Sequence, residues 1–266
     1  MDFEGNLARI RRSIGRPSGC SARTVLGRSW RSQVTAVGGH FLENDTYVHA
    51  WEAVLELLQD GTTEDILCDI GMPIMHRNVG YNCRVFILNR KVILIRPKLC
   101  MANDGNYREL RYFTPWGKRG SSTGGNVYGE LEDYYLPRGV RAVCGQDKVP
   151  IGIAAIATTD TVIASETCEE LFAPDSPHTH LGLAGVEIIS NGSGSHHQLR
   201  KLATRLDLIK SATSKTGGAY LYANQQGCDG GRLYYDGCSM VMINGRLLAQ
   251  ASQFSMEVKT SHKKII

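Results

Sequence analysis

A β-strand is expected to give way to a helix within Ala164-Ser165-Glu166-Thr167-Cys168-Glu169-Glu170-Leu171-Phe172. An apolar, β-prone run at 161–164 leads into the cysteine, and a helix-prone Glu-Glu-Leu-Phe sequence follows it. A thiol at such a turn lies at a helix N-terminus, where the macrodipole favours the thiolate that attacks carbonyl carbons. The same pattern also fits a buried cysteine that only packs. Cys168 is therefore a candidate nucleophile, and the rest of the chain has to decide between the two interpretations.

A β-hairpin upstream supplies a candidate lysine. The apolar runs Tyr81–Leu88 and Val92–Ile95 flank the polar turn Asn89-Arg90-Lys91, which is a typical hairpin pattern. The second run continues into Arg96-Pro97-Lys98, so Lys98 stands at a strand end, where functional side chains of α/β folds commonly emerge. A solvated surface lysine is the alternative.

The other elements predict an α/β protein with mixed sheets and helices packed outside them. Residues 65–73 read as a strand ended by Gly71 and Pro73, and strand–turn–strand units recur through the second half of the chain. Helical spacing is expected in three segments, at residues 2–14, 45–58 and 197–212. Residues 15–39 keep neither helical nor strand periodicity. The loop 117–128 lacks the order of a phosphate-binding loop, and no strand leads into it.

Composition excludes several functional classes. The chain has 266 residues, 42% of them hydrophobic and 21% charged, which is ordinary for a globular protein. Its net charge of +4 is too small and dispersed to indicate nucleic acid, and no apolar run approaches the roughly 20 residues that span a bilayer. The start is not a signal peptide. Eight scattered cysteines without a C-x-x-C pair predict reduced thiols and a cytoplasmic location. The adjacent His196 and His197 lack further ligand spacing, so no metal site is predicted.

Four blocks of uncommon sequence occur in a fixed order, and together they carry a resemblance. They are Gly71–Asn78, then Arg96–Lys98 followed by Asn106–Glu109, then Ser165–Leu171, and finally Asn191–His197 with Ala223–Gly230 beyond it. In this order they resemble the glutaminase (amidase) domain of animal-type glutamine-dependent NAD synthetases. These domains form a branch of the nitrilase, or carbon–nitrogen hydrolase, superfamily.

The resemblance implies a fold, a reaction and a set of site residues. The fold is a nitrilase-type αββα four-layer sandwich with two mixed sheets, here expected to be incomplete at both ends. The reaction releases ammonia from L-glutamine, through a Glu–Lys–Cys triad, for amidation of deamido-NAD in NAD biosynthesis. Carried over residue by residue, Cys168 matches the nucleophile and Lys98 the triad lysine, Glu132 the auxiliary acid, and Tyr107, Ser195 and Arg200 the positions that hold glutamine. No cofactor is expected for this half-reaction, because ATP and Mg belong to a synthetase domain.

The sequence departs from the family where the base glutamate is expected. The family has a Gly-Pro-Glu-Leu-Glu-Ile block in that interval, whereas this chain reads Leu26-Gly27-Arg28-Ser29-Trp30-Arg31-Ser32-Gln33-Val34. Codons for Leu-Gly-Pro-Glu-Leu-Glu-Ile-Thr-Gly, read one base later, encode the observed run. We therefore interpret residues 16–39 as an aberrant, frame-shifted segment.

The domain prediction follows from these departures. Residues 1–255 form the carbon–nitrogen hydrolase domain, including the aberrant segment but lacking the family's first strand, and residues 256–266 form a basic tail unlike the family. The synthetase domain is absent.

Two functional hypotheses from different classes remain open. The first is the glutaminase portion of a glutamine-hydrolysing NAD synthetase, impaired in this chain because the base is missing. The second is a catalytically inactive, truncated amidase-like domain with at most a role in assembly. The expected partners are L-glutamine and, for assembly, a second copy or a full-length synthetase. Nucleic acid and membrane are not expected partners.

Overall fold

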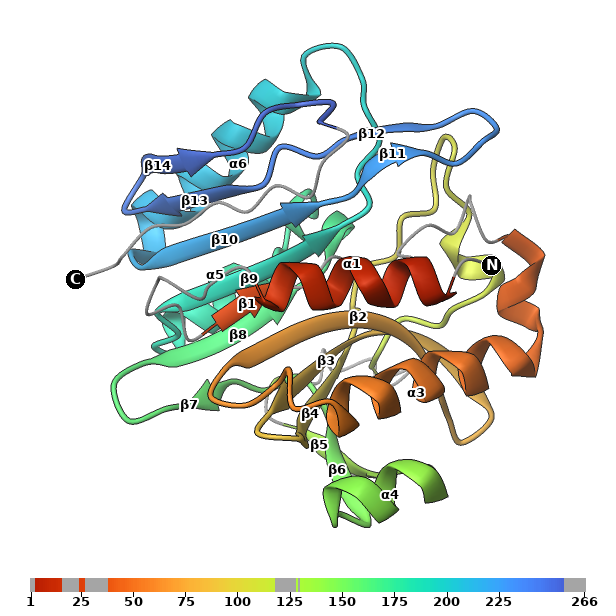
Figure 1. Ribbon diagram of the computed structural model, residues 1–266. Helices are drawn as coiled ribbons and strands as arrows, with labels where there is room; N and C mark the ends of the chain where they lie inside the picture. The colour runs from red at the N-terminus through yellow and green to blue at the C-terminus, as the bar shows by residue number, and fades with distance from the viewer. Residues whose placement is uncertain (1–2, 16–23, 27–37, 118–127, 129, 256–266) are drawn as a thin grey trace.

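The computed structural model describes residues 3–15, 24–26, 38–117, 128 and 130–255 (Figure 1). Two six-stranded sheets form its centre. The strand order of the first sheet is β1-β2-β3-β4-β6-β5, and that of the second is β14-β13-β10-β9-β8-β7. Both sheets combine parallel with antiparallel neighbours, as in the parallel pair β8·β9 and the antiparallel pair β2·β3.

The strands of the first sheet come from the first part of the chain. They are β1 (Thr24–Leu26), β2 (Leu67–His76), β3 (Val79–Leu88), β4 (Lys91–Pro97), β5 (Leu131–Tyr135) and β6 (Lys148–Gly152). Those of the second sheet are β7 (Ile156–Ala157), β8 (Val162–Glu166), β9 (Ile188–Ser193), β10 (Ala219–Asn224), β13 (Met240–Ile243) and β14 (Arg246–Gln250). A small ribbon is formed by β11 (Gln226–Cys228) and β12 (Tyr234–Asp236).

Helices cover the outer face of each sheet, which gives four layers (Figure 1). The first sheet packs on α1 (Phe3–Gly15), α3 (Asn44–Gln59) and α4 (Arg138–Cys144) through one large apolar cluster. The second packs on α5 (Pro177–Leu183) and α6 (Lys201–Thr216) through another. Short 3₁₀ turns are η1 (Gly38–Leu42), η2 (Glu109–Arg111) and η3 (Cys168–Leu171). The expected αββα sandwich with two mixed sheets is confirmed. No described helix is long and apolar enough to cross a bilayer.

Strand β2 shows why these sequences form buried sheets. Successive side chains of a strand point to opposite faces, and here Cys68 and Ile70 join the cluster under the helices. Leu67 instead packs between the sheets, where it joins Phe86 and Leu94 of the first sheet and Ile163 of the second. Because both faces are covered, β2 reads as a nearly continuous apolar run rather than as a strict alternation.

A buried polar link joins the two sheets beside this apolar layer. Asp69 on β2 accepts a hydrogen bond from Arg84 Nε of β3 at 2.7 Å and one from Ser190 Oγ of β9 at 2.5 Å. Asp69 and Arg84 are both 0% exposed. Gly192 leaves room for Arg84, since a Cβ added there would lie 2.0 Å from Arg84 Nη1. The first sheet is thereby fixed to the second by a charged pair and a hydroxyl.

Three expectations about elements need correction. The strand predicted to stop at Gly71 and Pro73 continues to His76. Proline is tolerated there because β1 pairs with β2 only as far as Asp69, so in the described part of the chain Pro73 has a strand neighbour on one side only. The helix predicted from residue 197 begins at Lys201, after Arg200 with a φ of +67°.

The third correction concerns the interval 15–39, where no strand was predicted. Residues 24–26 form β1, which runs parallel to β2. The remainder of the frame-shift interpretation, residues 16–23 and 27–37, lies outside the described residues, as do the basic tail 256–266 and most of the loop 117–128.

Candidate functional site

Cys168 lies where β8 ends and η3 begins, as the sequence indicated, but the helix that follows is a single 3₁₀ turn. A helix macrodipole therefore contributes little to the ionisation of the Cys168 thiol. Its φ is +47°, a left-handed conformation that is uncommon outside glycine. The backbone N–H of Cys168 donates a hydrogen bond to Asn191 Oδ1 of the neighbouring strand at 3.1 Å, which holds this conformation. The residue is only 8% exposed.

The electrostatics of the Cys168 thiol combine opposing effects. Burial raises its pKa, whereas the Lys98 ammonium and a hydrogen bond from the Gly194 backbone N–H lower it. The carboxylates of Glu169 and Glu109 raise it again, so that the pKa of the thiol lies above its usual value. The net effect of these groups favours the thiol over the thiolate. Attack on a carbonyl carbon therefore requires a base that removes this proton.

Lys98 follows β4 and is buried, with only 2% of its surface exposed, so the solvated-lysine alternative is wrong. Its Nζ donates a hydrogen bond to Glu109 Oε2 at 2.6 Å. Burial lowers the pKa of Lys98, but the charges of Glu109 and Cys168 outweigh it, and the pKa lies above its usual value. Lys98 is thus a permanent cation beside the thiol.

Glu109 is the site carboxylate that the sequence reasoning missed. It opens η2 and is 1% exposed. Besides Lys98, it accepts hydrogen bonds from Asn82 Nδ2 at 2.7 Å and from the Ala102 backbone N–H at 2.8 Å. Glu109 closes the block Asn106–Glu109, from which the sequence comparison selected Tyr107 alone. Its position in the sequence, shortly after β4 and Lys98, was the one feature from which it could have been identified.

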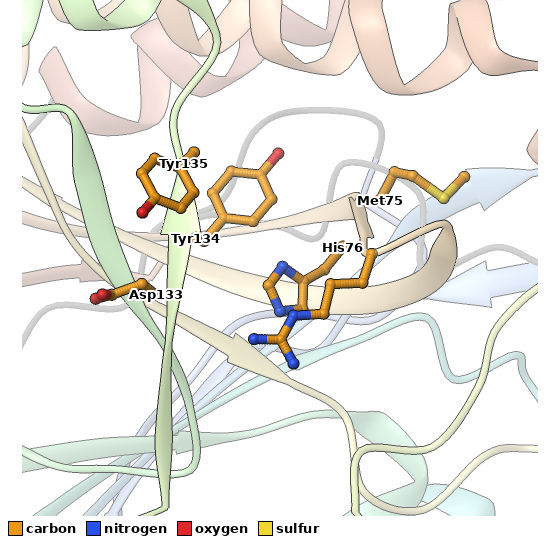
Figure 2. A pocket seen from close by; sticks show the side chains of 6 residues that line it. Met75, His76, Asp133, Tyr134 and Tyr135 are labelled. Atoms are coloured by element: carbon orange, nitrogen blue, oxygen red, sulfur yellow. The ribbon is translucent and has the colours of Figure 1, made fainter.

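Glu132 is not brought to the site, which corrects its assignment as the auxiliary acid. It lies on β5, an edge strand of the first sheet, with 40% of its side chain exposed. Its Oε2 pairs with His76 Nε2 and Arg77 Nη1, each at 3.0 Å. These partners line a separate pocket of about 560 Å³, formed by the β2–β3 hairpin and β5, with Met75, His76, Arg77, Asp133, Tyr134 and Tyr135 around it (Figure 2). The carboxylate beside Lys98 is Glu109 instead.

The three residues expected to hold glutamine occupy different positions. Tyr107 is buried, and its hydroxyl donates to the Gly194 carbonyl at 2.7 Å while accepting from the His196 backbone N–H at 3.1 Å. It therefore fixes the loop whose Gly194 N–H faces Cys168. Ser195, in the same loop, is 2% exposed, and its hydroxyl has no hydrogen-bond partner among the described residues. Arg200 is exposed and forms no ion pair with a described residue.

A buried carboxylate, Glu166, is connected to Cys168 through Tyr220 and Asn191. Glu166, the last residue of β8, accepts hydrogen bonds from the His178 backbone N–H at 3.1 Å and from the hydroxyl of Tyr220. Asn191, which holds the Cys168 N–H, donates its Nδ2 to the same hydroxyl oxygen at 2.9 Å. Burial opposes ionisation of Glu166, but the contacts with His178 and Tyr220 outweigh it, so its pKa lies below the usual value.

Glu166 should make the stability of the protein sensitive to acid. Its folded pKa lies below the unfolded one, so its stabilising contribution is complete above the ordinary glutamate pKa and disappears as the pH falls through the folded pKa. The difference in unfolding free energy between the wild type and Glu166→Gln should therefore shrink between about pH 6 and about pH 3. Urea titrations over this range measure it, with the exposed Glu64→Gln as the matched control. A difference that stays constant over the range would contradict the assignment.

No group of three or more His, Cys, Asp or Glu side chains in the described residues is arranged to hold a metal ion. The described cysteines, Cys168 included, are free thiols. The groups gathered around Cys168 are thus a lysine, carboxylates and backbone N–H donors. They are suited to attack on a carbonyl carbon and to stabilisation of the resulting oxyanion.

Comparisons with known proteins agree with this arrangement. The family model described as carbon–nitrogen hydrolase matches residues 1–262. A glutamine-dependent NAD(+) synthetase from Dictyostelium discoideum is 56% identical over 257 residues, a match that covers 96% of this chain and 35% of that protein. The human glutamine-dependent NAD(+) synthetase is 52% identical over 257 residues, covering 97% of this chain and 35% of that protein.

A solved structure shares the fold. The glutamine-dependent NAD(+) synthetase from Cytophaga hutchinsonii matches with a TM-score of 0.78 at 23% identity, covering 96% of this chain and 39% of that chain. The chain thus spans about a third of the length of the curated relatives it matches. Because the family model covers nearly all of its residues and the two sheets have the expected four-layer arrangement, the chain belongs to the carbon–nitrogen hydrolase family.

Proposed function

We propose that this domain is the glutamine-hydrolysing part of an NAD(+) synthetase, with Cys168 as the nucleophile. The observation that carries the proposal is the meeting of Cys168, the buried Lys98–Glu109 pair and the Gly194 N–H. Lys98 emerges from the first sheet, whereas Cys168 and Gly194 emerge from the second. The names of the Dictyostelium and human relatives, both glutamine-dependent NAD(+) synthetases, support L-glutamine as the substrate.

The chemistry follows from these groups. The sulfur of Cys168 bonds to the side-chain amide carbon of glutamine, and the carbon–nitrogen bond breaks. The proton that leaves the thiol ends on the amide nitrogen, which departs as ammonia. Water then cleaves the thioester to give glutamate and the free thiol. Lys98 stabilises the negative charge that develops on the amide oxygen, and Glu109 holds Lys98 in place.

The use of the ammonia belongs to the same proposal. It would serve the amidation of deamido-NAD by a synthetase domain, where ATP and Mg would act. The cytoplasmic location, and assembly with a second copy or with a full-length synthetase, stay predictions from the sequence.

The second candidate function is that of a catalytically inactive domain, which no longer hydrolyses glutamine. The run Leu26–Val34 stands where the family's base glutamate is expected. The pKa of the Cys168 thiol lies above its usual value, so a protein without that base leaves the nucleophile protonated. In this case the domain acts at most in assembly.

Restoring the base should separate the two candidates. We expect the unmodified chain to release ammonia from glutamine slowly, because proton transfer by a positioned base typically contributes about 10²–10⁴-fold. A variant in which Leu26–Val34 is replaced by Leu-Gly-Pro-Glu-Leu-Glu-Ile-Thr-Gly should gain on the order of 100-fold or more. Coupled detection of ammonia and glutamate measures both rates.

Cys168→Ala is the control in both backgrounds. Fast ammonia release from the unmodified chain that disappears in Cys168→Ala would show that the base is not missing. A restored chain that folds but stays inactive would favour the assembly role.

A further inference from the structure

Glu170 is a fully buried carboxylate that the proposed reaction does not use. It lies in η3, the turn that Cys168 begins, and in the sequence it stands out only as part of a helix-prone run. A buried charge is costly unless it is paired and hydrogen-bonded. The partners of Glu170 therefore indicate its role.

One oxygen of Glu170 is bonded to both halves of the sandwich. Oε2 accepts a hydrogen bond from Arg96 Nη1 at 2.5 Å and another from the Thr167 backbone N–H at 2.5 Å. Arg96 lies on β4 of the first sheet, whereas Thr167 follows β8 of the second sheet and directly precedes Cys168. Arg96 is buried as well, so water and salt screen this ion pair only weakly.

The other oxygen of Glu170 contacts the first half at a second point. Oε1 accepts a hydrogen bond from the Leu99 backbone N–H at 2.5 Å. Arg96 and Leu99 stand on either side of Lys98 in the sequence. The backbone N–H of Lys98 itself donates to the Asn82 carbonyl of β3 at 2.8 Å, which fixes the lysine to the first sheet. One side chain thus joins the segment that carries Lys98 to the turn that carries the nucleophile.

The separation of Lys98 from Cys168 affects the reactivity of the thiol. The ammonium of Lys98 lowers the pKa of the thiol, and Cys168 in turn raises the pKa of Lys98. The other charged groups that act on or respond to Cys168 are Glu109, Glu169 and Lys201. A charge–charge interaction weakens as the distance grows. A shift of one segment relative to the other therefore changes the ionisation of the thiol.

We propose that Glu170 is a positioning residue, which sets the distance between Lys98 and Cys168 by holding their two segments in one register. In this role it acts through its three hydrogen bonds rather than on the reacting atoms. The inference rests on the proposed function for its catalytic meaning, but the placement of the two groups can be measured without glutamine.

The pH profile of Cys168 alkylation tests the inference. Iodoacetamide forms a sulfur–carbon bond with the thiolate as iodide leaves, and the thiol proton passes to solvent, so the rate follows the thiolate fraction. Peptide mass spectrometry separates Cys168 from the other free cysteines. Rates between about pH 6 and about pH 10 show whether the pKa of the thiol moves and in which direction.

Glu170→Gln should raise the pKa of the Cys168 thiol and, at about pH 8, slow its alkylation by about 3- to 10-fold. The glutamine side chain has a single acceptor oxygen, so it cannot replace both carboxylate oxygens of Glu170. Charge alone predicts the opposite sign, because removal of a nearby carboxylate favours the thiolate. The direction of the change therefore separates a positioning role from a purely electrostatic one.

Two control variants separate positioning from stability. Arg96→Met combined with Glu170→Gln removes one charge of each sign, so it should recover stability that Glu170→Gln loses, while alkylation stays slow. Leu58→Ala, in the apolar cluster between α3 and the first sheet, lowers stability by leaving a cavity but touches none of the bonds of Glu170. Its alkylation profile should match that of the wild type.

Three outcomes would overturn the inference. A Glu170→Gln profile that is unchanged, or that moves to lower pH, would show that Glu170 does not set the distance. A double variant with the wild-type profile would assign the effect to the guanidinium left without its carboxylate. A shift of equal size in Leu58→Ala would assign it to lost stability.

Failure of the proposed function is seen in a separate measurement. A wild-type chain that forms no Cys168 thioester with glutamine, after acid quench, would refute the glutaminase function. The alkylation profiles would still decide whether Glu170 places Lys98 beside the thiol.

Discussion

Replacing Lys98 by methionine should slow the acylation of Cys168 by glutamine by about 10²–10³-fold, the typical loss when one oxyanion-stabilising donor is removed. Lys98 contributes in two ways. Its ammonium lowers the pKa of the thiol, and in the proposed reaction it stabilises the negative charge that develops on the amide oxygen. The thioester that accumulates after acid quench, measured by intact-mass spectrometry, follows the acylation step directly.

The same substitution also affects stability, and a double variant separates the two effects. Loss of Lys98 leaves Glu109 buried without its cation, and breaking a buried pair typically costs about 3–5 kcal/mol of unfolding free energy. Lys98→Met combined with Glu109→Gln removes the unpaired charge and should recover much of that stability. The acylation rate should stay low in the double variant. An acylation rate within about 10-fold of the wild type in either variant would contradict the oxyanion role.

The second large effect is expected for the polar link between the sheets. Asp69→Ala should lower the unfolding free energy by about 3–5 kcal/mol, because it breaks a buried pair by removing the carboxylate that the fully buried Arg84 contacts. It also removes the acceptor of the Ser190 hydroxyl. Urea denaturation followed by circular dichroism measures the change.

The control for Asp69→Ala replaces both charges. Asp69→Leu with Arg84→Met fills the space with apolar side chains, and such replacements of buried pairs are often neutral or stabilising. The double variant should therefore be more stable than Asp69→Ala alone. If both variants lose the same free energy, the cost arises from packing and not from breaking the buried charged pair.

The layered fold was predictable from the sequence because local signals were strong. Asn89 and Arg90 form the turn between β3 and β4 with positive φ values of 50° and 61°, as expected from the polar residues between two apolar runs. The strand leading to Cys168 and the amphipathic helix over residues 45–58 were equally clear. Strand β1 was not predictable, because residues 24–26 become a strand by pairing with β2 rather than by their own periodicity.

The candidate site was predictable only in part. Cys168 and Lys98 were found because each stands at a strand end that the sequence indicates. Glu109 was missed because its role depends on a contact with Lys98 that no local pattern encodes. Glu132 was misassigned because its position in the sequence does not show that it lies on an edge strand, where it pairs with His76 instead of Lys98.

The two central residues of the proposed site are divided between the two sheets, with Lys98 after β4 and Cys168 after β8. A slide of one sheet along the other would separate them while every ladder hydrogen bond inside each sheet survived. Catalytic competence therefore reports on tertiary docking and not on secondary-structure content. A molten-globule-like state with both sheets formed would therefore lack activity. The hydrogen bond from Ser190 to Asp69 requires the two sheets to be docked, so it distinguishes the native protein from that state.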